Sequence, residues 1–205
     1  MNLYKAQRIR FSFIPISLSQ IGLILKQQTL DVSNLRIKIG NHTFNDLFES
    51  GFDCLNPQTY RRSDNSLRSL FFECNSVNGT IVVSSTCSWA SLLYQISHSI
   101  EQGIYDFWIS DLKTEDEACN FFTYIENAKT QRAFYSMKDP RWKFYQCGIP
   151  LWFENLEYYK ERIIGRRVNR AILTEYCHAL NLEIEKDAFW EIKGDSIIYE
   201  YYWEK

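Results

Sequence analysis

The sequence predicts an α+β fold in which most strands of the sheet are antiparallel. Three observations support this: short β-prone runs come in pairs around turn residues, apolar residues at helical spacing occupy separate segments, and the two kinds of segment do not alternate regularly as they do in a doubly wound parallel sheet. The 205 residues are 45% hydrophobic, which is enough to bury the core of one compact domain over residues 1–205. A weak boundary or mobile loop is expected near 51–66, where the pattern is irregular.

The first elements follow from local patterns. Polar and apolar residues alternate over 6–14, which predicts a strand, and residues 17–28 suit a helix capped at Ser17 or Ser19. Over 35–44 the pattern predicts a strand, a tight turn at Gly40-Asn41 and a second strand.

The strongest local signal is a hairpin over 66–86, where two β-prone runs flank Asn78-Gly79. A helix over 88–103 should follow and end at Gly103. Its apolar side chains share one helical face: Trp89, Leu92, Leu93, Ile96 and Ile100.

Residues 104–111 predict a strand. The next segment, 114–129, predicts a helix, because Thr114 and Glu117 have capping-box spacing and the first turn is acidic. Two further strands are expected over 131–137 and 141–148, joined around Asp139-Pro140.

Residues 150–182 predict two helices broken near 165–169, with Asn169 capping the second helix and Asn181 ending it. The last 17 residues predict a hairpin around Gly194-Asp195. In its final strand one face should join the core, and the other is acidic and aromatic and suits a basic partner. The core face holds Ile197, Tyr199, Tyr201 and Trp203, and the other holds Ile198, Glu200, Tyr202 and Glu204.

No motif in the sequence predicts a cofactor, a metal site or a reaction. Neither a GxGxxG nor a GxxxxGK[ST] pattern occurs, and the six cysteines, at positions 54, 74, 87, 119, 147 and 177, contain no closely spaced pair. They are expected to be free, mostly buried thiols of a cytoplasmic protein. The adjacent Cys177 and His178 would diverge by about 100° on a helix and cannot form a nucleophile and base.

Charge is distributed unevenly along the chain. Residues 101–126 hold seven acids and one Lys, whereas 129–170 hold ten Lys or Arg and four acids. Residues 183–205 are acidic again, with seven acids and three Lys. Such a layout can steer a charged partner to one side of the molecule, or it can place opposite charges together as surface pairs.

These features lead to the hypothesis of a binding protein without catalytic activity. With 14 Phe, 13 Tyr and 6 Trp, aromatic side chains should reach the surface and anchor a partner. The overall profile is similar to that of immunity proteins as a class, which neutralise a toxin enzyme by direct binding. For a basic partner the predicted binding residues are Asp106, Trp108, Asp111, Glu115, Asp116, Glu117 and Tyr124.

The alternative hypotheses about function rest on the basic segment 160–170. For an acidic partner, its arginines are the predicted surface: Arg162, Arg166, Arg167 and Arg170. The same residues beside nearby aromatic side chains could serve a DNA-binding regulator, or, together with His178 or a carboxylate, an enzyme that acts on nucleic acid. A pI of about 6.0 argues against both. The plainest interpretation is a solvated helix surface.

Overall fold

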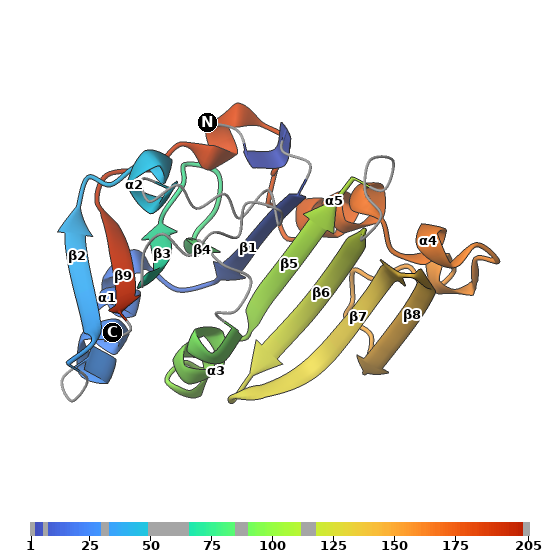
Figure 1. Ribbon diagram of the computed structural model, residues 1–205, viewed down its shortest axis with the longest axis horizontal. Helices are drawn as coiled ribbons and strands as arrows, with labels where there is room; N and C mark the ends of the chain where they lie inside the picture. Colours follow the sequence, from blue (N-terminus) through green and yellow to red (C-terminus); the bar gives the residue numbers. More distant parts are fainter. Residues whose placement is uncertain are drawn as a thin grey trace.

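The computed structural model describes residues 3–5, 8–29, 33–48, 66–84, 90–111 and 118–202. A nine-stranded sheet runs through the molecule in the order β2-β9-β3-β4-β1-β5-β6-β7-β8 (Figure 1), and every pairing within it is antiparallel. The predicted α+β fold class is confirmed. Within the described residues, no helix has the length and apolar character needed to cross a membrane.

The strands are β1 (Arg8–Ile14), β2 (Leu35–Gly40), β3 (Ser66–Phe72), β4 (Thr80–Ser84), β5 (Ile104–Ser110), β6 (Cys119–Glu126), β7 (Lys129–Asp139), β8 (Arg141–Gly148) and β9 (Ser196–Tyr202). The α-helices are α1 (Leu18–Thr29), α2 (Phe44–Phe48), α3 (Ala90–His98), α4 (Ile164–Arg167) and α5 (Arg170–Ala179). Short 3₁₀ helices are η1 (Leu3–Lys5), η3 (Tyr158–Lys160) and η4 (Asp187–Trp190).

Two apolar clusters form the core. The larger one is rich in aromatic rings, because Phe11, Phe107, Phe122 and Phe134 lie opposite one another on four neighbouring strands. Their ring centroids are 4.9 to 5.3 Å apart, and Tyr176 of α5 packs edge-on against Phe134. The smaller cluster includes buried residues of α1 and α3. The sheet is therefore packed on both faces.

Several predicted elements are confirmed. The β3–β4 hairpin forms, with residues 73–79 as a longer connection than the expected two-residue turn. Strands β7 and β8 pair across Pro140, and α5 begins at the predicted cap, where the Asn169 side chain accepts a hydrogen bond from the Ile172 amide at 3.1 Å. Ser17 and Gln20 exchange hydrogen bonds at the start of α1.

The helix predicted over 114–129 is wrong, because residues 119–126 form strand β6. Residues 112–117, including Thr114 and Glu117, lie outside the described residues. Asn127 and Ala128 have positive φ angles of 51° and 55°, the geometry of a type I′ turn that joins β6 to β7. Pairing with β5 and β7 outweighed the local helix signal.

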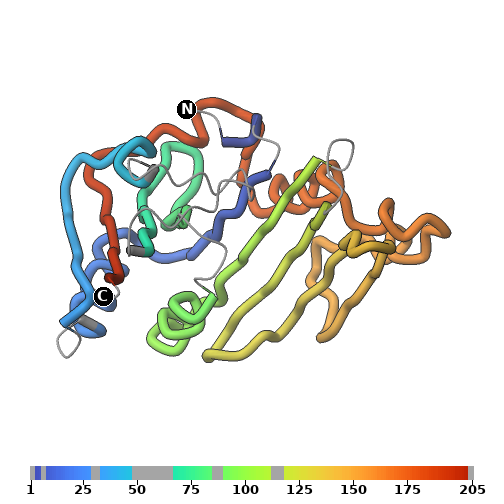
Figure 2. Tube along the Cα trace, in the orientation of Figure 1, coloured from blue at the N-terminus to red at the C-terminus, as the bar shows by residue number. Residues whose placement is uncertain are grey.

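Two predicted hairpins do not form. After β2 the chain enters α2 instead of a second strand, because Thr43 and Asp46 make a capping box in which the Thr43 amide donates to Asp46 Oδ2 at 2.6 Å. Near the C-terminus, residues 187–190 form η4, and β9 inserts between β2 and β3. Figure 2 shows this last strand beside segments far away in the sequence.

Helix boundaries also differ from the prediction. Helix α3 ends at His98, and Gly103 lies under the ring of Tyr124 instead of ending the helix; Trp89 lies outside the described residues. The first of the two helices predicted over 150–182 is replaced by irregular chain, η3 and α4. The expected loop near 51–66 falls almost wholly outside the described residues, apart from the start of β3.

Candidate protein-docking surface

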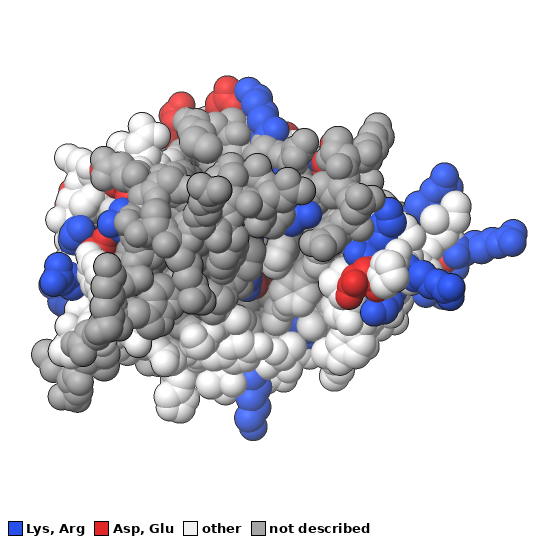
Figure 3. Space-filling model, in the orientation of Figure 1, with Lys and Arg blue, Asp and Glu red and all other residues white. Residues whose placement is uncertain are grey.

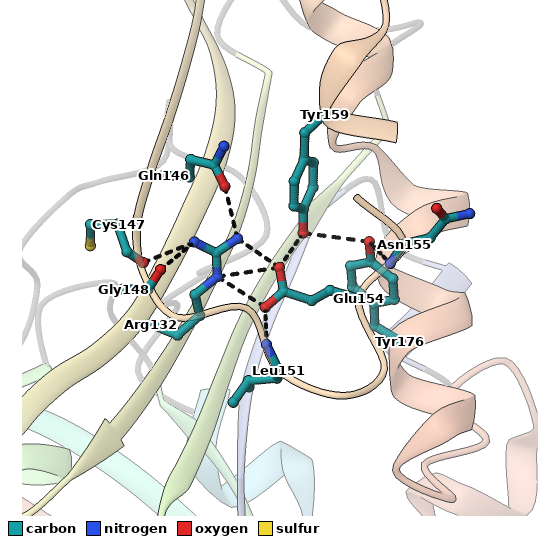
Figure 4. A network of polar contacts seen from close by, with 9 residues as sticks. All are labelled: Arg132, Gln146, Cys147, Gly148, Leu151, Glu154, Asn155, Tyr159 and Tyr176. Atoms are coloured by element: carbon teal, nitrogen blue, oxygen red, sulfur yellow. Dashed lines mark hydrogen bonds and ion pairs between the residues drawn. The ribbon is translucent and has the colours of Figure 1, made fainter. Parts of the chain in front are cut away.

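A buried ion pair organises the end of the molecule that contains β8. Arg132 on β7 donates from Nη2 to Glu154 Oε2 at 2.7 Å and from Nε to Glu154 Oε1 at 2.9 Å, and the two side chains are 1% and 0% exposed. The other guanidinium hydrogens reach Gln146 Oε1 and the carbonyls of Cys147 and Gly148 (Figure 4). One side chain thus joins β7, β8 and the segment after β8.

Glu154 holds the segment after β8 through further bonds. Its carboxylate accepts hydrogen bonds from the Leu151 amide at 2.8 Å and from the Tyr159 hydroxyl at 2.7 Å. The Tyr176 hydroxyl donates in turn to Tyr159 at 3.4 Å. Residues 151–159 are therefore attached both to the sheet and to α5.

The electrostatics of this network favour a charged Arg132 and a protonated Tyr159 hydroxyl. Burial disfavours the Arg132 cation, but hydrogen bonds and the charge of Glu154 outweigh burial and raise the pKa of Arg132. Burial, together with hydrogen bonds to Tyr176 and Glu154, raises the pKa of Tyr159 far above its ordinary value. The Tyr159 hydroxyl therefore remains a hydrogen-bond donor. A buried pair of this kind adds little net stability, but removing one partner is costly, so it fixes the path of the chain.

The anchored segment presents large apolar side chains to solvent. Seven large hydrophobic side chains are exposed among the described residues, and five of them lie between positions 145 and 163. We call these five the docking surface: Tyr145 (47% exposed), which points to the opposite face of β8 from Phe144, and, in the segment after β8, Ile149 (85%), Trp152 (76%), Leu156 (44%) and Ile163 (50%). The other two, Leu23 and Ile39, lie on α1 and β2.

Basic side chains surround the docking surface. Figure 3 shows Lys and Arg gathered at the end of the molecule formed by β8 and α4. Of the four arginines predicted from the sequence, Arg162 and Arg166 are exposed. Arg167 donates to the Glu161 carbonyl and lies over the Phe144 ring, and Arg170 donates to the Tyr4 carbonyl at 2.7 Å. Two of the four are thus engaged within the fold.

Of the residues predicted to meet a basic partner, Asp106, Trp108 and Tyr124 are described and do not share one surface. Asp106 is 2% exposed and accepts hydrogen bonds from Arg10 and Ser12, both at 2.8 Å, so its carboxylate is already engaged within the fold. Trp108 and Tyr124 lie on opposite faces of the sheet, since Tyr124 is opposite Tyr105 and positions 105 and 108 alternate in direction.

Of the remaining acidic positions, the structure describes only Asp111. Asp111 follows β5 and is partly exposed, and Glu115, Asp116 and Glu117 lie outside the described residues. Tyr124 is partly buried and donates to Glu126, and burial together with the charge of Glu126 raises the pKa of Tyr124 to about 12.

On the acidic face predicted for the last strand, Glu200 pairs with cations of the same chain. Strand β9 has a neighbour on each side, and Glu200 is 1% exposed. Its carboxylate pairs with Arg68 at 2.6 Å and with Lys38 at 3.0 Å. Glu200 therefore does not meet a partner. Trp203 and Glu204 lie outside the described residues.

The arginines and His178 do not converge on one site. Eight residues of α5 separate His178 from Arg170, which is about 12 Å along the helix axis. His178 pairs with Glu185, and Cys177 is fully buried in the core. Among the described residues, no three His, Cys, Asp or Glu side chains lie close enough together to hold a metal ion.

The thiols differ in exposure. Cys74, Cys119, Cys147 and Cys177 are not in disulfide bonds; the first and last are buried and the other two are partly exposed. Cys54 and Cys87 lie outside the described residues.

Sequence reasoning missed the pair that anchors the docking surface. Arg132 stands in an ordinary strand pattern, and Glu154 was placed in a predicted helix. No local signal marks this pair, because the two residues are 22 positions apart and meet only in the folded chain. Comparison with protein-family models, curated proteins and solved structures found no match.

Proposed function

We propose that this chain is a protein-binding module without catalytic activity, and that it engages another protein through the docking surface. The observation that carries the proposal is the concentration of exposed large hydrophobic side chains between positions 145 and 163. Large apolar side chains that are exposed together at one end of a monomeric protein, among polar residues, mark interaction sites.

The composition and anchoring of the surface support the proposal. Trp, Tyr and Arg are the residue types that most often dominate binding energy at interfaces, and Trp152, Tyr145 and Arg166 are all exposed here. The buried contact between Arg132 and Glu154 holds the segment in place before binding. Association then loses less conformational entropy than it would with a disordered loop.

Charge favours an acidic partner. Residues 141–167 contain six Lys or Arg and three acids, and one of those acids, Glu154, is neutralised by Arg132 from outside this range. A basic surface attracts an acidic one and speeds their association. In the narrower version of the proposal, the chain is an immunity-type inhibitor and the acidic surface belongs to a toxin enzyme.

The test is affinity capture of the tagged chain from cells of its own organism, with three versions run side by side. The wild type and Leu23→Ala should retain the same protein in stoichiometric amount, whereas the double variant Ile149→Ala/Trp152→Ala should lose it. Leu23 is the matched control because it is also a largely exposed apolar residue, at 64%, and lies on α1 away from the docking surface. Equal retention by all three versions would contradict the proposal, and so would an eluate whose main bound component is nucleic acid.

A further inference from the structure

Among the residues that the structure describes, strand β8 is one of the two ends of the sheet and has a neighbour on one side only. It pairs with β7 along its whole length, from Arg141 to Gly148, and none of its residues is buried. The outer backbone N–H and C=O groups of such an edge strand are a template on which another extended chain can pair. In Figure 1, α4 lies near the start of β8, and no strand lies beyond it.

A row of aromatic side chains leads across the sheet to this edge. Trp108, Phe121, Tyr135 and Tyr145 lie directly opposite one another on β5, β6, β7 and β8, and Arg10 continues the row on β1. All four rings lie on one face and belong to neither core cluster. The last two rings stack, with centroids 5.4 Å apart and planes 25° apart. Tyr145 therefore ends the row with its outer side toward the open edge.

The charges on β8 lie on the same face as this row. Arg141, Lys143 and Tyr145 are two residues apart along the strand, so their side chains point to the same side of the sheet, and all three are exposed. A strand added to β8 would therefore meet, in order, two cations and one aromatic ring.

We propose that β8 receives an extended segment of the protein partner as a tenth, antiparallel strand. This inference rests on the proposed function and names how the partner is recognised. The segment carries an aromatic residue opposite Tyr145 and acidic residues two and four positions after it, opposite Lys143 and Arg141. Main-chain hydrogen bonds supply affinity, and the alternate side chains supply specificity.

Two other occupants fit the same edge less well. A second copy of this chain would bring the basic end of each molecule against that of the other, with Arg141, Lys143, Arg162 and Arg166 on both sides. Unpaired nucleic-acid bases need free ring faces on which to stack, and on β8 only the outer face of Tyr145 is available, because Tyr135 stacks on the other.

The first test uses synthetic ten-residue peptides of Thr and Val. One carries Phe with Glu two and four positions after it, and its control has the same composition with Glu one and three positions after Phe. The first peptide should bind more tightly than the control. Tyr145→Ala should raise its Kd about tenfold and Lys143→Glu about fivefold, whereas Lys193→Glu, an exposed cation elsewhere, should leave it unchanged.

Backbone methylation makes the test specific for strand addition. In a paired strand, alternate N–H groups face β8 and the others face solvent. Methylating one alternate set of peptide nitrogens should abolish binding, and methylating the other should not. Equal effects of both sets, or equal binding of both peptides, would overturn the inference.

A second readout separates this inference from the proposed function. With the partner protein captured above, hydrogen exchange at amides of residues 141–148 should slow on binding. Slower exchange confined to 149–163 would overturn strand addition and leave the docking surface standing. Retained nucleic acid or self-association of the chain through β8 would overturn it as well.

Discussion

At the scale of single residues, burial decides which charges can meet a partner. Asp106, Glu154 and Glu200 are all nearly fully buried, and each has an arginine as partner. Arg162 and Arg166, by contrast, are exposed. The charge counted along the sequence therefore differs from the charge on the surface. The exposed arginines make the basic end of the molecule the more available one for a charged partner.

Replacing Glu154 should destabilise the fold strongly. Glu154→Gln keeps the size of the side chain but leaves the Arg132 cation buried without a counter-charge, which costs about 3–5 kcal/mol. Urea unfolding should show this loss in the free energy of unfolding. Glu157→Gln is the matched control, because its ion pair with Lys160 is exposed, and it should change stability little. Equal effects of the two substitutions would refute the role given to the buried pair.

Glu200 should make stability depend on acidic pH. Burial alone would raise its pKa, but hydrogen bonds from Tyr202 and Lys38 and the charge of Arg68 lower it overall. Because the folded pKa lies below the unfolded value of about 4.3, the pair stabilises the fold above that pH and loses its effect as pH falls through the folded pKa. Glu200→Gln should flatten this part of the stability curve. If the variant lost stability at acidic pH as the wild type does, Glu200 would not be the cause of that pH dependence.

At the scale of elements, the end of β8 depends on a glycine that no other residue can replace. Gly148 has a φ of +81°, and a Cβ there would lie 1.8 Å from the Gln131 carbonyl oxygen. This position is where the chain leaves β8 for the anchored segment. The sheet edge and the docking surface therefore both depend on Gly148.

Gly148→Ala should consequently destabilise the protein by more than the left-handed backbone penalty of about 1–2 kcal/mol. Gly194→Ala is the control, because Gly194 also has a positive φ, of +69°, but nothing lies within 4 Å of its Cβ position. Thermal unfolding of the two variants separates the cost of the clash from the cost of the backbone angle. Equal losses of stability would mean that the β8 end relaxes to accept the side chain.

The elements that sequence could predict are those whose signals are local. The Asn169 cap and the β3–β4 hairpin follow from neighbouring residues alone. Strand β6 and the place of β9 do not, because pairing with strands distant in the sequence decides them. The docking surface could be predicted only as a basic segment, since exposure of Trp152 depends on how Arg132 fixes a segment 22 residues away.

At the scale of the whole molecule, the two ends of the long sheet differ in charge and in exposed apolar side chains. At one end, β2 carries Lys38, which pairs with Glu200 of β9. At the other end, β8 and the segment after it combine an open sheet edge, exposed apolar side chains and an excess of positive charge. This asymmetry gives a partner one preferred side from which to approach.

The most direct test of this account is calorimetric titration of the purified partner with the wild type, Trp152→Ala and Leu23→Ala. A central aromatic anchor contributes about 2 kcal/mol or more, so Trp152→Ala should raise the Kd about 30-fold, while Leu23→Ala should match the wild type. Equal Kd values for Trp152→Ala and the wild type would contradict the claim that the docking surface binds the partner.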